Sequence, residues 1–191
     1  MEHKVSKQIL DSWNCICEVL IKYHKTVELG FSHVKLLTAH RTTFDSVKPA
    51  EIEDTTLYRQ DPEIKSKLLH AIRKEINIET KVLADVLKEL DQMHQLIIKE
   101  CDKVFSLFNT LRENLDLSHM TAATETTSSI SDMLAALDRF KIYFSDDHLA
   151  RKYSIERSSL GVAPEDLLSF WDSSELQSVT QDVGCIISIS E

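Results

Sequence analysis

Cysteine and histidine are the side chains of this chain best suited to hold a metal ion, and their spacing does not favour one. Cys15 and Cys17 lie two residues apart in a helical pattern, so their side chains point about 200° away from each other. His33 and His40 are seven residues apart. Seven residues of helix span about 10 Å, which is too far for a shared ion. The sequence therefore predicts no metal site.

Glycine is the residue that nucleotide-binding loops need, and this chain has three isolated ones, Gly30, Gly161 and Gly184. Neither the G-x-G-x-x-G fingerprint nor the glycine-rich loop that cradles ATP phosphates fits such a sequence. The G-x-S-x-G nucleophile motif is also absent, and no spacing singles out a catalytic pair among the many carboxylates. We predict no catalytic residue, no cofactor and no enzymatic activity. An enzyme is the third alternative, and it would need a polar pocket inside the helices.

Composition indicates a folded, acidic, helical protein. The chain has 191 residues, of which 42% are hydrophobic and 28% charged, with a net charge of −9 and three prolines. So few turn residues argue against β-folds, and the negative charge disfavours direct nucleic-acid binding. No apolar run approaches the roughly 18 residues of a membrane span, and no signal peptide is evident. We expect no membrane partner, and reduced cysteines in the cytoplasm or nucleus.

The first long helix is expected over residues 1–48. Apolar residues recur at alternating spacings of four and three between residues 9 and 44, a heptad seam typical of packing against another helix. Gly30 and Arg41 interrupt this seam, and Gly30 permits a close helix approach or marks a bend. The seam residues predicted as partner contacts are Trp13, Leu20, Val27 and Val34.

A linker is expected over 49–61 and a long central helix over 62–117. Asp61 is placed to cap the free amides at the start of this helix. The central helix carries a second heptad seam, and Glu79 falls on it. We therefore predict a bend near 77–80.

The remaining segments complete an all-α fold: an elongated bundle of long heptad-patterned helices with shorter C-terminal helices. A linker rich in serine and threonine is expected over 118–129, a third helix over 130–158, and acidic short helices over 159–191. A strand is an alternative at 186–190, where β-branched residues gather. Two long seams offer more apolar surface than a simple hairpin buries, so an external helical partner and self-association both stay open.

One part of the third helix has a recognisable pattern. Its residues are Ser129, Ile130, Ser131, Asp132, Met133 and Leu134, followed by Tyr143 and then by Arg151, Lys152 and Tyr153. The segment 129–157 resembles the C-terminal half of the AIRIM family, the ribosome maturation factors that interact with AAA+ ATPases. A looser similarity extends upstream and downstream and covers about two-thirds of the chain.

The resemblance implies a non-enzymatic adaptor subunit. AIRIM-like proteins pair with a second small helical protein, the cyclin-dependent-kinase-interacting protein, and associate with AAA+ ATPases of the spermatogenesis-associated type. The assembly acts in late maturation of the large ribosomal subunit, which makes the pre-ribosomal large subunit an indirect partner, in cytoplasm and nucleus. On this resemblance, Arg151, Lys152 and Tyr153 are expected to contact the partner protein or the ATPase. The alternative is a self-associating coiled-coil structural or tethering protein.

Overall fold

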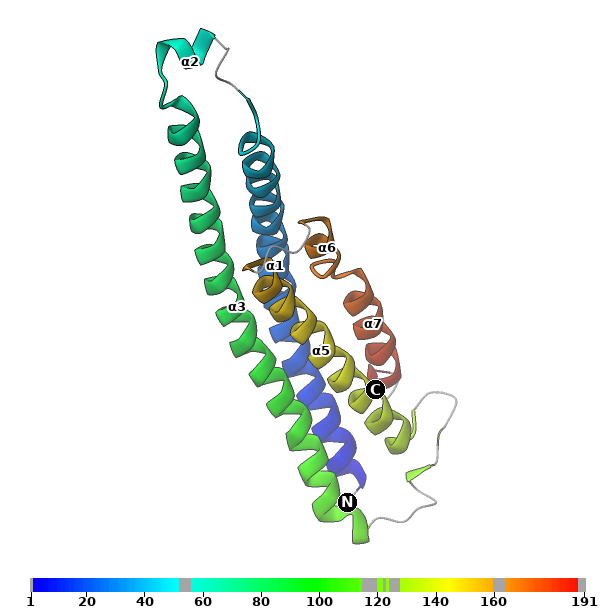
Figure 1. Cartoon of the computed structure of the whole chain (residues 1–191). Helices are drawn as coiled ribbons and strands as arrows, with labels where there is room; N and C mark the ends of the chain where they lie inside the picture. Colours follow the sequence, from blue (N-terminus) through cyan, green and yellow to red (C-terminus); the bar gives the residue numbers. More distant parts are fainter. Residues whose placement is uncertain are drawn as a thin grey trace. The chain divides into compact units, whose positions relative to one another are not determined.

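The computed structural model describes residues 2–51, 56–114, 120–121, 123, 128–159 and 164–188. Helices dominate these residues, and no β-strand occurs in them, so the predicted all-α class of long helices followed by shorter ones is confirmed (Figure 1). None of the described helices is both long and apolar enough to cross a membrane. The elements are α1 (Glu2–Val47), α2 (Thr56–Gln60), α3 (Ile64–Leu111), η1 (Arg112–Asn114), α5 (Ile130–Ser159), α6 (Pro164–Ser169) and α7 (Ser174–Ser188).

The expected linker 49–61 contains the short helix α2, whose five residues are too few to show a helical period. Helix α3 is continuous through 77–80, and the bend expected there stays a prediction. The linker expected at 118–129 lies mostly outside the described residues. Where a strand was an alternative, α7 is helical to Ser188.

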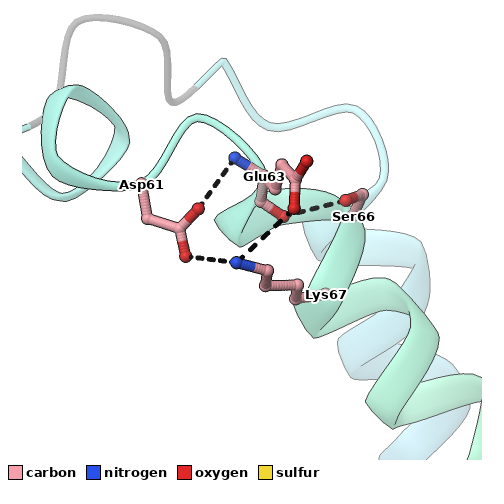
Figure 2. A network of polar contacts seen from close by, with 4 residues as sticks. All are labelled: Asp61, Glu63, Ser66 and Lys67. Carbon is pink, nitrogen blue, oxygen red and sulfur yellow. Dashed lines mark hydrogen bonds and ion pairs between the residues drawn. The ribbon is translucent and has the colours of Figure 1, made fainter.

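Asp61 caps α3, as its position in the sequence predicted (Figure 2). Its Oδ1 accepts the backbone N–H of Glu63 at 3.0 Å, and its Oδ2 accepts a hydrogen bond from Lys67 Nζ at 2.8 Å. The Lys67 bond, and then the Glu63 amide, hold the pKa of Asp61 below its usual range. Ser66 adds a bond from its hydroxyl to the Glu63 carbonyl oxygen at 2.8 Å. The bond from the Glu63 amide to Asp61 satisfies one of the backbone N–H groups that the first turn of a helix leaves free.

The described helices form two compact units, each with its own core. The first unit comprises Met1–Thr26, Glu89–Ala150 and Ser173–Glu191. Trp13 of α1 meets Phe140 of α5 edge to face, with ring centroids 5.1 Å apart, and Phe140 stacks on Phe144. The buried apolar side chains of α1, α3, α5 and α7 in this unit include Ile9, Ile16, Leu20, Leu90, Ile97, Val104, Leu137, Leu176, Val183 and Ile187.

The second unit comprises Val27–Lys88 and Arg151–Asp172. The sequence left open whether Gly30 permits a close helix approach or marks a bend. The group that approaches it is a side chain: an ideal Cβ on Gly30 would lie 2.0 Å from Cζ3 of Trp171. The indole therefore lies directly on the backbone of α1. The other buried apolar side chains of this unit include Val34, Leu37, Ile72, Leu83, Val86, Ile155 and Leu167.

Candidate functional site

The four seam residues predicted as partner contacts lie inside the chain's own cores. Trp13 and Leu20 are buried in the first unit, and Val27 and Val34 in the second. A partner that used these side chains would have to displace the helices that cover them. Their burial gives the interface assignment no support, and it stays a prediction.

The triplet Arg151, Lys152 and Tyr153, on which the resemblance partly rests, has one buried and two exposed residues. Arg151 is fully buried, and its Nη2 donates a hydrogen bond to the Asp172 carbonyl oxygen at 3.3 Å. Lys152 and Tyr153 are exposed. The guanidinium of Arg157 lies 5.4 Å from the centroid of the Tyr153 ring, within the range of a cation–π contact. Lys152 and Tyr153 are accessible to a partner, whereas Arg151 lies inside the unit.

Arg151 belongs to a buried polar chain that connects α5 with the segment after α6. Trp171 Nε1 donates to the Ser154 hydroxyl at 3.0 Å, and that hydroxyl donates to the Arg151 carbonyl oxygen at 2.7 Å. Trp171 and Ser154 are both buried. Buried polar groups are costly unless hydrogen-bonded, so this chain of bonds fixes Trp171 against Gly30.

A cluster of titratable side chains lies in the first unit, where α1, α3 and α5 meet. His148 Nε2 lies 2.8 Å from Asp91 Oδ1, and His148 Nδ1 lies 3.4 Å from the Tyr23 hydroxyl. The His94 ring stacks on His148, with centroids 4.5 Å apart and planes 13° apart, and its Nε2 lies 3.4 Å from Ser145 Oγ. Sequence reasoning missed this cluster. The available signal was the pair of i,i+3 spacings, Asp91 with His94 and Ser145 with His148, each on one helix face.

The order carboxylate, imidazole, hydroxyl is that of a general-base arrangement, in which Asp91 would orient His148 and His148 would activate the Tyr23 oxygen. Such chemistry needs a substrate at the hydroxyl. Tyr23 is fully buried and His148 nearly so, so a substrate has no access to that oxygen. The cluster holds α1, α3 and α5 together through a network whose polar atoms satisfy one another.

A second, partly buried polar pair crosses from α1 to α3 in the second unit. His33 Nδ1 lies 2.7 Å from Glu79 Oε2, and Glu79 is buried. The seam position of Glu79, which suggested a bend, is therefore a polar contact inside the helix packing. Within the described ranges, no three histidine, cysteine or acidic side chains are grouped so that they could hold a metal ion.

These features define an all-α protein. Its buried, hydrogen-bonded polar side chains lie within the helix packing and include Tyr23, Glu79, His148 and Arg151. The family model described as "Ribosome biogenesis protein C1orf109-like" matches residues 45–186, more than half of the chain. The chain therefore belongs to this family of ribosome biogenesis proteins, and the predicted AIRIM membership is confirmed. The matched region includes the resemblance segment 129–157. None of the curated proteins compared with the chain matches it.

Proposed function

We propose that the chain is a non-enzymatic adaptor subunit of an AAA+ ATPase complex that acts in late maturation of the large ribosomal subunit, in the cytoplasm and nucleus. The match of residues 45–186 to a ribosome biogenesis family is the observation that carries this proposal. The segment 129–157, on which the resemblance to ATPase-associated maturation factors rests, lies within that match.

The burial of the reactive side chains and the lack of a phosphate loop support an adaptor. Tyr23 and His148 of the polar cluster are buried, and the sequence has no glycine-rich phosphate loop. Any ATP hydrolysis would belong to a partner subunit. In this proposal the partners are AAA+ ATPases of the spermatogenesis-associated type and the cyclin-dependent-kinase-interacting protein. Of the triplet Arg151, Lys152 and Tyr153, the exposed Lys152 and Tyr153 contact these partners.

The alternative, a self-associating coiled coil, would use the α1 seam between residues 9 and 44. That seam already packs within the chain: Trp13 against Phe140, and Val34 in the core of the second unit. The burial of these side chains supports the adaptor over the homodimer.

Affinity purification of the tagged full chain from cells, followed by mass spectrometry, tests the proposal. We expect recovery of AAA+ ATPases together with large-subunit assembly factors. The double variant Lys152→Glu/Tyr153→Ser should reduce that recovery. Lys74→Glu/Ile78→Ser, a matched control that changes an exposed lysine and an exposed apolar residue on α3, should leave it unchanged. Recovery of neither class of protein by the unaltered chain would contradict the proposal.

A further inference from the structure

The outer face of α5 carries apolar side chains that no described part of the chain covers. Ile142 and Leu149 lie seven residues apart and are 56% and 62% exposed. Ala135, seven residues before Ile142, is exposed on the same face. Scattered exposed aliphatic residues are ordinary on protein surfaces. A heptad spacing on one helix face is the pattern that packs against a second helix.

Two carboxylates alternate with these apolar side chains. Asp138 precedes Ile142 by four residues and Asp146 follows it by four, and both are exposed. We refer to Ala135, Asp138, Ile142, Asp146 and Leu149 as the α5 ridge. Neither Asp138 nor Asp146 forms an ion pair with any residue that the structure describes. The neighbouring Lys141 is already engaged with Asp102 of α3 at 2.6 Å. The negative charge of the ridge is thus not neutralised by a described neighbour.

A hollow lies beside the ridge, between α5 and α7. It has a volume of about 290 Å³, and Arg139 and Tyr143 line it on the α5 side. Val179, Val183 and Ile186 give its α7 wall an apolar surface, with Asp182 at the same wall. Tyr143 follows Ile142 directly, so the hollow begins about 100° around α5 from the ridge. A helix lying on the ridge would have this hollow available for one apolar side chain.

We propose that the α5 ridge binds an amphipathic helix of another protein, in which apolar residues at heptad spacing are flanked by lysine or arginine. Charge complementarity identifies this occupant, because basic flanks would pair with Asp138 and Asp146. A second copy of the chain would place the same carboxylates opposite one another, between two molecules that each carry a net charge of −9. The inference rests on the proposed adaptor function for the identity of the partner, and it adds the chemistry of the partner's binding segment.

The test uses the full chain in cells with a photoreactive amino acid substituted for Ile142. The matched control carries the same substitution at Ile21, which lies on α1 in the same unit and is 59% exposed. We expect a cross-link from position 142 that is absent from position 21. The cross-linked peptide should carry apolar residues at heptad spacing with lysine or arginine beside them. A cross-link to a second copy of this chain or to an acidic segment would overturn the inference. A cross-link yield from position 142 no higher than that from position 21 would also overturn it.

Binding of that peptide, made synthetically, to the purified full chain supplies the second measurement. Ile142→Ser/Leu149→Ser and Asp138→Lys/Asp146→Lys should each weaken binding at least about tenfold, and Ile21→Ser should change it less than about twofold. A peptide with its basic residues changed to glutamate should regain affinity for Asp138→Lys/Asp146→Lys. Unchanged affinity in both double variants contradicts the inference.

The two proposals can fail separately. If the ridge variants still recover the AAA+ ATPases and assembly factors in full, the ridge assignment is wrong and the adaptor function stands. If a basic helix cross-links to the ridge but belongs to no ribosome-assembly or ATPase complex, the ridge assignment stands and the adaptor function is wrong.

Discussion

The six-membered ring of Trp171 lies against Gly30, so close that a β-carbon at position 30 would be 2.0 Å from Cζ3 and 2.7 Å from Cη2 of the indole. The indole is held on its other side by the bond from Nε1 to Ser154 Oγ. It cannot withdraw from a larger residue 30 without breaking a buried hydrogen bond. The missing side chain of Gly30 is therefore what permits the segment after α6 to dock on α1.

Gly30→Ala is expected to lower the free energy of unfolding by about 1–2 kcal/mol, because overpacking against the indole outweighs the improved helix propensity. Chemical denaturation followed by circular dichroism measures this change. Gly184→Ala is the matched control. A β-carbon there would lie 3.6 Å from Trp13 Nε1, an ordinary contact, so the variant should be neutral or more stable by up to about 1 kcal/mol. Equal behaviour of the two variants would refute the close-packing argument.

Arg151→Ala is expected to destabilise the protein by about 2–4 kcal/mol, since it removes a fully buried side chain and its bond to the Asp172 carbonyl. Lys152→Ala, one residue further along, should stay within about 0.5 kcal/mol, as exposed substitutions usually do. Urea unfolding of both variants provides the comparison. A similar loss in each would mean that Arg151 is not part of the core.

A double-mutant cycle on Asp91 and His148 is expected to give a coupling energy of about 1 kcal/mol, because the two groups share a 2.8 Å contact. Asp91→Ala removes the carboxylate, and His148→Phe keeps a ring against His94 while removing both nitrogens. The free energies of unfolding of the two single variants and the double variant give the coupling. Additivity within about 0.3 kcal/mol would show that the contact contributes nothing beyond packing.

Thiol labelling of the native protein should distinguish Cys101 from Cys15 and Cys185. Burial raises the pKa of Cys101 to about 12, so it stays a neutral thiol at pH 8, whereas Cys15 and Cys185 are exposed. Because the thiolate is the reactive form, a disulfide reagent at pH 8 should modify the exposed pair first. Cys101 should react at the rate of unfolding.

The same pKa shift has a consequence for stability. An unfolded cysteine loses its proton near pH 8.5, while folded Cys101 keeps it, so this group lowers stability as the pH rises above about 8.5.

Mass-spectrometric mapping of the labelled sites in native and urea-unfolded protein checks the labelling order. Early modification of Cys101 in the native protein would show that it is not buried.

Local sequence patterns were sufficient to predict much of the helical structure. The heptad positions Ile9, Ile16 and Leu20 are buried as their spacing requires, and Asp61 caps α3 because side-chain capping depends on a few consecutive residues. Such features are set within one or two helical turns, and a single sequence displays them.

Long-range contacts were not predictable in the same way. His148 meets Tyr23 across 125 residues of chain, and neither spacing nor composition indicates which helix faces will meet. Glu79 shows the same limit: its seam position suggested a bend, and its partner is His33, 46 residues away. The seam residue Trp13 was assigned to a partner because burial in a core and burial at an interface require the same apolar side chain.

The contacts of Trp13 constrain when this protein can fold during its synthesis. Trp13 meets Phe140, and it lies within ordinary contact distance of a β-carbon placed at Gly184. Helix α1 therefore leaves the ribosome long before the residues of α5 and α7 that cover Trp13 have been translated. Until α7 emerges, the apolar face of α1 in this unit is exposed on the nascent chain, where it is open to aggregation or to a chaperone. Completion of this core is a late step in folding, because its closing contact joins segments that are far apart in the chain.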